Sequence, residues 1–306
     1  MASRFLCKRL RISKVALRNT VLGLLFASPW IIGFLIFTLY PVVASLYYSC
    51  TQYNILTPPK WVGLENYKDL LKDELFWTSL YNTLYMTIIG VPVGTALAFA
   101  AALLLNLKVR GIALYRTVYY LPSIVPLVVS SILWMWFLNP RYGPVNFFLS
   151  LLGLKGPGWL ADPAWSKAGI LLMGFWWVGG PAIIFLAGLQ DIPAELYESA
   201  ELDGANWWQK TWSITLPMLT PVILFNAIVG TINYFQTFAR AYIMTEGGPI
   251  NSTLFYVLYL YRTAFEYLKM GYASAMAWIL LVVILIVTLI LFTTSAKWVY
   301  YGGESR

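Results

Sequence analysis

Charged side chains are scarce in this sequence. Only 11% of its 306 residues are Asp, Glu, Lys or Arg, whereas 59% are hydrophobic. An average soluble chain is about 25% charged. A soluble core has no use for so much apolar surface, so we expect most of the chain to be solvated by lipid.

Other absences narrow the function. The sequence has no histidine, and Cys7 and Cys50 have neither the spacing of metal ligands nor that of a disulfide framework. It has no G-x-x-x-x-G-K-[ST] phosphate loop, so we do not expect it to hydrolyse ATP. Its hydroxyls and carboxylates lack an evident base partner, which disfavours a membrane enzyme. The net charge of +8 is spread over short connectors, which favours membrane orientation over nucleic-acid binding.

What the chain does contain is a series of charge-free windows. Six of them exceed the roughly 20 residues that a helix needs to cross a bilayer. They predict an all-α polytopic membrane protein with transmembrane helices at about 22–49, 79–106, 115–138, 167–189, 216–239 and 272–296. A shorter window, 247–261, begins with GGP and is interpreted as an interfacial or re-entrant helix on the outer side.

The N-terminal tail sets the expected orientation. Its first 18 residues carry six Lys or Arg and no acid, which predicts a cytoplasmic location by the positive-inside rule. Six spans then put both termini in the cytoplasm. We expect one transmembrane domain over 1–306, with a cytoplasmic N-tail at 1–20, a cytoplasmic loop at 190–217 and a cytoplasmic C-tail at 297–306.

The loop at 190–217 is unusually acidic. Of the 13 acidic residues in the chain, five lie between Asp191 and Asp203. Pro193 suits the first turn of a helix and Gly204 suits a left-handed cap at its end. The tryptophans 207, 208 and 212 follow at once. A solvated loop explains the acids but not the tryptophans, so we favour a helix–turn–helix that docks a soluble partner.

These residues resemble a known motif. Glu198-Ser199-Ala200, three residues, Gly204, nine residues, Ile214, one residue and Leu216-Pro217 resemble the EAA loop of ABC-importer permeases, with Ser in place of the usual central Ala. The segments YRTVYYLPSIVPLVVSSILWMWFLNPRYGPVN, GGPINSTLFYVLYLYRTAF and MGYASAMAW resemble the carbohydrate branch, the permeases of maltose and glycerol-3-phosphate type. The resemblance covers nearly the whole chain.

The resemblance implies a transport subunit, not an enzyme, in the bacterial cytoplasmic (inner) membrane. It implies a second homologous permease, two ATP-binding cassette subunits that hold ATP and Mg, and an extracellular solute-binding protein, with no cofactor bound by this chain. The loop would be a coupling helix seated in a groove of the ATPase. By the resemblance, Glu198 and Gly204 carry the coupling, and Ala200, Ile214 and Leu216 fill the groove.

The spans themselves contain no charge in their middles. Arg116, Lys167 and Arg240 lie at span ends, where long side chains extend toward the interface. This argues against a proton relay and favours a neutral cargo. An ion-coupled secondary transporter remains an alternative, with sodium held by carbonyls of broken helices. A further alternative is an ABC permease for another small solute, such as glycerol 3-phosphate.

A polar stripe marks the candidate pathway. Asn226, Gly230, Asn233 and Thr237 share one helical face. In span four, Trp177 and the Gly179-Gly180-Pro181 break predict exposed backbone groups. The alternative is that small and polar residues only hold helices together. By the resemblance to maltose-type permeases, the sugar contacts fall on Val178, Gly179, Ala182, Gly230, Asn233, Tyr234 and Thr237.

Overall fold

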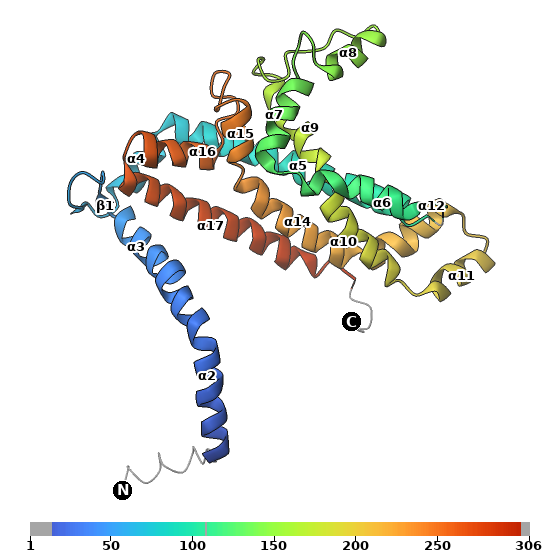
Figure 1. Cartoon of the computed structure of the whole chain (residues 1–306), viewed down its shortest axis with the longest axis horizontal. Helices are drawn as coiled ribbons and strands as arrows, with labels where there is room; N and C mark the ends of the chain where they lie inside the picture. The colour runs from blue at the N-terminus through green and yellow to red at the C-terminus, as the bar shows by residue number, and fades with distance from the viewer. Residues whose placement is uncertain (1–13, 108, 301–306) are drawn as a thin grey trace.

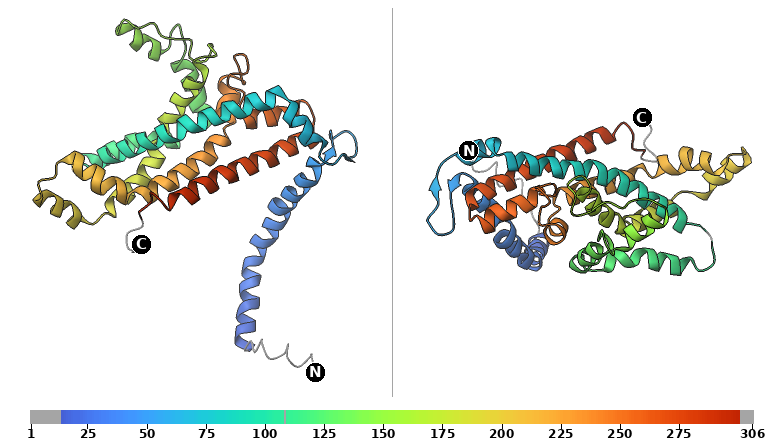
Figure 2. Two further views of the ribbon diagram at one scale, coloured as in Figure 1. Left: turned by 180° about the vertical axis from the view of Figure 1, so that it is seen from behind. Right: turned by 90° about the horizontal axis from the view of Figure 1, so that it is seen from above.

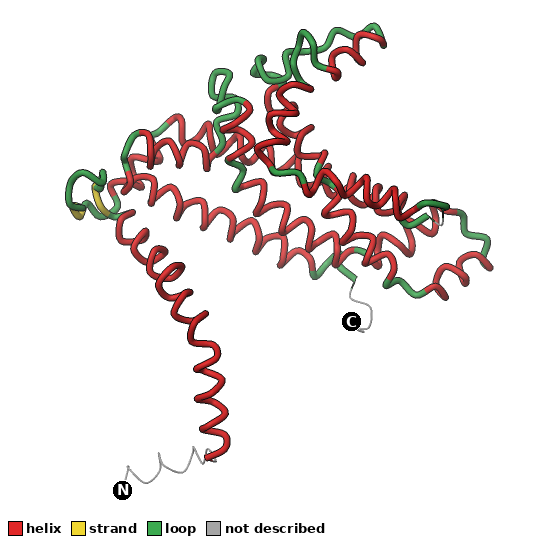
Figure 3. The backbone as a smooth tube through the Cα atoms, viewed as in Figure 1, coloured by secondary structure: helices red, strands yellow, loops and turns green. Residues whose placement is uncertain are grey.

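Helices make up nearly all of the described chain. The computed structural model describes residues 14–107 and 109–300. Figure 3 shows helix along most of this part. Its strands are a short antiparallel pair, β1 (Thr51–Gln52) and β2 (Lys60–Trp61). The all-α prediction is therefore confirmed. Of the predicted tails, residues 1–13 and 301–306 lie outside the described residues.

Three candidate spans are unbroken. The first runs from Arg18 to Ser49 through α2 (Lys14–Phe34), the π-helical turn η1 (Leu35–Leu39) and α3 (Tyr40–Ser49). The others are α5 (Glu74–Leu105) and α17 (Met270–Ser295). Pro29 and Pro92 lie inside α2 and α5, and both helices continue through them. Neighbouring groups can satisfy the freed carbonyls of a membrane helix.

Three further spans are bent pairs of helices. They are α6 (Ile112–Tyr120) with the 3₁₀ turn η2 (Leu121–Ile124) and α7 (Leu127–Phe137), bent by 99°, α9 (Ser166–Trp176) with α10 (Gly179–Gln190), bent by 48°, and the helices of Trp207–Met218 with α14 (Thr220–Phe235), bent by 64°. Counted as one span each, they bring the candidate spans in the described residues to six, as the sequence predicts. The sharpest bend has a clear cause: Val125 precedes Pro126 and is extended, with ψ 129°.

The remaining elements are short. They are α4 (Glu65–Lys72), α8 (Pro144–Leu151), α11 (Ala194–Leu202), α12 (Trp207–Lys210), the π-helical turn η3 (Thr211–Thr215), α13 (Leu216–Met218), α15 (Ala239–Met244), α16 (Tyr256–Tyr261) and the π-helical turn η4 (Arg262–Glu266).

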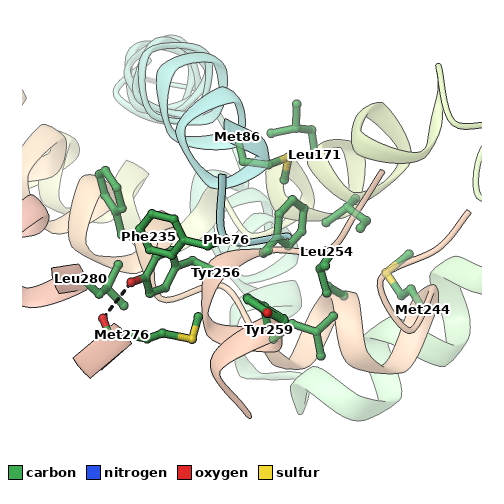
Figure 4. Close-up of a cluster of buried hydrophobic side chains, with 14 of the residues drawn as sticks. Phe76, Met86, Leu171, Phe235, Met244, Leu254, Tyr256, Tyr259, Met276 and Leu280 are labelled. Atoms are coloured by element: carbon green, nitrogen blue, oxygen red, sulfur yellow. Dashed lines mark hydrogen bonds between the residues drawn. The ribbon is translucent and has the colours of Figure 1, made fainter. Parts of the chain in front are cut away.

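The segment before and within α16 lies in the protein core. Leu254, Phe255, Tyr256 and Leu258 are almost completely buried. Figure 4 shows Tyr256 among apolar side chains, and its hydroxyl donates to the Met276 carbonyl at 2.8 Å. These side chains pack against protein, which argues against the interfacial alternative, and the re-entrant alternative stays a prediction.

Buried polar side chains tie α16 and α17 to α5. The Asn82 amide donates to the carbonyls of Asn251 and Leu254 at 2.8 and 3.1 Å. Asp73 caps the start of α5 by accepting from the Leu75 amide, and it also accepts from the hydroxyls of Tyr259 and Tyr272. Burial raises the pKa of the Asp73 carboxyl, but these hydrogen bonds outweigh it, and the pKa lies below its usual value.

The connectors fall into two separate groups. Both views in Figure 2 place the loop that carries α11 and α12 and the β1–β2 connection at opposite extremities of the molecule. In Figure 1 the C-terminal end of α17 lies on the same side as α11, whereas α4 lies beside β1. The cytoplasmic location of 190–217 stays a prediction.

Candidate functional site

The acidic loop forms an ordered helix–turn–helix. Helix α11 begins after Pro193, and Glu195 lies in its first turn, where the helix dipole favours negative charge. The helix ends in a Schellman motif. Gly204 has φ +77°, its amide donates to the Glu201 carbonyl at 3.0 Å, and the Ala205 amide donates to the Ala200 carbonyl at 2.9 Å. The predicted left-handed cap is present.

The second half of the loop is fixed by three side-chain contacts. Asn206 and Gln209 form a capping box at the start of α12. Lys210 forms an ion pair with Glu201 at 2.7 Å, which joins α12 to α11. The Tyr197 and Thr215 hydroxyls form a hydrogen bond at 2.9 Å, which joins α11 to η3. The loop is therefore a defined unit.

The motif residues divide between the surface and the interior of this unit. Glu198, Ser199 and Gly204 are exposed. Ala200, Ile214, Leu216 and Pro217 are half-buried, and Ile214 packs against the core formed by α5 and α10. The most exposed apolar side chains of the loop are not those of the motif. Leu202 is 90% exposed, and Trp207, Trp208 and Trp212 are each more than half exposed. The tryptophans were expected from the sequence. Leu202 lies between Ala200 and Gly204, at a position where the motif specifies no residue, and it was missed.

A cavity of about 240 Å³ lies where two helices break. Trp177 and Val178 join α9 to α10, and α14 ends at Phe235. The third wall is α5, at Gly90, Val91, Gly94 and Thr95. Gly90 is needed here, because a Cβ at this position would lie 2.3 Å from the Tyr234 ring.

Most of the predicted pathway residues line this cavity. They are Trp177, Val178, Asn226, Gly230, Asn233, Tyr234 and Thr237. Gly179 and Ala182 do not. A Cβ at Gly179 would lie 2.4 Å from the Tyr119 carbonyl oxygen, and Ala182 is completely buried in the core between α5 and α10. In this structure both residues serve close helix packing.

Sequence reasoning missed other lining residues. The α5 wall, Gly174, Phe175 and Arg240 were not predicted, whereas Pro181 belongs to the predicted break. The Gly90-x-x-x-Gly94 spacing was the available signal for α5, since small residues mark close helix approach in membranes.

The position of the Arg240 side chain differs from the prediction. The sequence predicts that its side chain extends toward the interface from the end of a span. Helix α14 instead ends at Phe235, and Phe238 leaves helical geometry before α15 begins. This turn brings Arg240 to the cavity wall, with its guanidinium 5.0 Å from the centre of the Trp177 ring.

The chain matches a protein family. Residues 90–301 match the model of the binding-protein-dependent transport system inner membrane component. The chain belongs to this family. The matched range includes the helix–turn–helix and all the cavity-lining residues named above.

Relatives of this inner-membrane component cover nearly its whole length. It is 44% identical over 294 residues to the probable ABC transporter permease protein YesP of Bacillus subtilis (strain 168), covering 94% of this chain and 95% of YesP. It is 37% identical to the lactose transport system permease protein LacF of Rhizobium radiobacter, covering 90% and 94%.

A solved structure of an ABC transporter supports the same family assignment. The inner-membrane component superposes with a TM-score of 0.81 and 26% identity on a chain of the bacterial alginate ABC transporter, crystallised in complex with an alginate pentasaccharide-bound periplasmic protein. The superposition covers 94% of this chain and 97% of that chain. The prediction of an ABC-importer permease, a transport subunit and not an enzyme, is confirmed.

Proposed function

We propose that this permease moves a sugar, an oligosaccharide in particular, from a solute-binding protein across the cytoplasmic membrane by alternating access. It works with a second, homologous permease and two ATP-binding cassette subunits, which hold ATP and Mg. The relatives named for lactose and alginate support a carbohydrate cargo. A periplasmic binding protein in the alginate complex supports the same kind of external partner here.

The single observation that carries the proposal is the helix–turn–helix at one extremity of the molecule. An acidic face and exposed apolar side chains lie together on α11, α12 and η3: Leu202, Trp207, Trp208 and Trp212. An ordered, mixed patch of this kind is typical of a protein-docking surface. We infer that it lies in the cytoplasm with both chain termini and seats in a groove of the ATPase.

The proposed mechanism depends on contact between this docking surface and the ATPase. Closure of the ATPase dimer moves α11, and the motion reaches the cavity because α14 continues directly from the loop. The cavity then opens outward to receive sugar, and ATP hydrolysis returns it inward. The neutral acceptors of Asn226, Asn233 and Thr237 suit sugar hydroxyls, and Trp177 and Tyr234 offer aromatic faces for the ring.

The test is a charge reversal on the docking surface. Glu198→Lys should abolish ATP-driven uptake in proteoliposomes while the protein still inserts, because Glu198 is exposed and its loss disturbs no internal contact. Glu65→Lys, an equal charge reversal at an exposed residue of α4 at the other extremity, is the matched control and should transport normally. Normal uptake by the Glu198 variant would count against the coupling role. Uptake driven by an ion gradient without ATP would favour a secondary transporter instead.

A further inference from the structure

The cavity contains a positive charge. Arg240 lines it together with Asn233, Tyr234 and Thr237. Its guanidinium lies over the Trp177 ring, and the Tyr234 hydroxyl lies beside it. A Cβ at Gly174 would meet Arg240 Nη1 at 2.9 Å and the Tyr234 hydroxyl at 3.3 Å, so both groups converge on one point of the wall.

No carboxylate neutralises this charge within the described chain. The ion pairs among residues 18–107 and 109–300 are Lys210–Glu201 and Arg262–Glu266. A charge removed from water without an ionic partner costs several kcal/mol. A cation–π contact returns only about 0.5–2 kcal/mol. The aromatic contacts therefore hold the guanidinium in place without compensating its charge.

Unpaired hydrogen-bond donors also lie at this wall. A guanidinium has five N–H donors and the Tyr234 hydroxyl can accept at most two of them. The indole N–H of Trp177 has no hydrogen-bond partner among the described residues. A wall with surplus donors and an uncompensated positive charge suits an anionic oxygen group, which a guanidinium binds in a bidentate manner.

We propose that the cargo is an acidic sugar and that Arg240 binds its carboxylate or sulfonate. This inference rests on the proposed function and replaces the neutral cargo that the charge-free spans favour. The neutral side chains of Asn226, Asn233 and Thr237 then bind hydroxyls of the same molecule. The cavity would therefore recognise one anionic group together with several neutral hydroxyls.

The experiment uses the complete transporter, with both permeases, the ATPase subunits and the solute-binding protein, in proteoliposomes. The probes are matched pairs: trigalacturonate against its trimethyl ester for the carboxylate, and sulfoquinovosyl glycerol against galactosyl glycerol for the sulfonate. The wild type should take up the acidic member of at least one pair in preference to its neutral partner. The pair that shows this preference identifies the anionic group.

Three variants separate charge recognition from structure. Arg240→Gln should lower uptake of the acidic probe by roughly 10- to 100-fold, the range expected for a hydrogen bond to a charged group, and should lower uptake of the neutral probe much less. Arg240→Lys should restore part of the acidic uptake because it keeps the charge. Arg141→Gln, a charge removed from an exposed site outside the cavity, should behave as wild type.

Two results would overturn the proposal while leaving the sugar-importer function intact. One is a wild type that takes up only the neutral probes or other neutral sugars. The other is an Arg240→Gln variant that loses acidic and neutral uptake equally, as a purely structural arginine would. Failure of the wild type to take up any sugar with ATP would instead refute the proposed function, and this inference with it.

Discussion

Gly204 offers a sharp test of why the motif contains a glycine. Its φ of +77° favours glycine, and the structure shows no heavy atom within 4 Å of an added Cβ. The cost of a side chain here is therefore conformational and not steric. For an L-residue the left-handed region costs roughly 1–2 kcal/mol. This corresponds to a factor of about 5–30 in the population of the capped loop.

The cost should follow how well each side chain tolerates the left-handed region. Asn tolerates it better than Ala, and β-branched Val tolerates it worst. We therefore expect ATP-driven uptake to fall in the order Gly204, Gly204→Asn, Gly204→Ala, Gly204→Val. Hydrogen exchange of residues 194–206 should accelerate in the same order, because the Ala205 and Gly204 amides lose their Schellman partners.

The control is Gly23→Ala. Gly23 lies within α2, has ordinary helical geometry and has no atom within 4 Å of an added Cβ, so this change should be neutral. Equal damage from Gly204→Asn and Gly204→Val would contradict this expectation. That result would mean that the glycine is needed for close approach of a partner and not for its backbone conformation.

Two further changes test the cavity and the outer end of the bundle. Gly90→Ala should lower the free energy of unfolding by about 1–3 kcal/mol, because its Cβ would lie 2.3 Å from the Tyr234 ring. Gly94→Ala is the control, because no atom lies within 4 Å of its added Cβ, and it should leave the stability unchanged. Equal melting temperatures for the two variants would refute the clash. Asp73→Asn keeps the helix cap but loses the charge that receives the tyrosine hydrogen bonds, so it should cost about 1–2 kcal/mol near neutral pH. Because the folded pKa of Asp73 is lowered, the wild-type advantage is complete above the unfolded pKa of about 3.9 and is lost as pH falls through the folded pKa. Melting temperatures that differ equally at pH 3 and pH 7 would contradict this assignment.

The sequence predicts the spans well because lipid imposes a simple rule. A charge-free apolar window long enough to cross the bilayer becomes a helix, as α5 and α17 show. What the windows do not show is where a span breaks. Pro92 leaves α5 continuous, whereas the chain between α6 and α7 bends by 99° at Val125 and Pro126. The outcome depends on which neighbours are present to satisfy the freed backbone groups.

The sequence predicts those parts of the site whose residues are close together along the chain. Gly204 and the acids of α11 are neighbours in sequence, so their motif identifies the loop directly. The cavity assembles from α5, the α9–α10 break and the end of α14. The polar stripe of α14 and the Gly179-Gly180-Pro181 break are visible as patterns, but nothing in the sequence shows that they meet α5. Arg240 is missed because a charged residue just beyond an apolar window is typical of a span end. Its position depends on α14 ending at Phe235, which no window indicates.

The central claim is that the loop carrying α11 and α12 contacts the ATPase in the cytoplasm. Leu202 is 90% exposed, so Leu202→Cys, in a chain with Cys7 and Cys50 replaced by Ser, gives an accessible thiol on this loop. In the assembled transporter a short bifunctional maleimide should join this thiol to an ATP-binding subunit, and a membrane-impermeant maleimide added outside intact cells should not label it. Labelling from outside, or a failure to cross-link to the nucleotide-hydrolysing partner, would contradict the account.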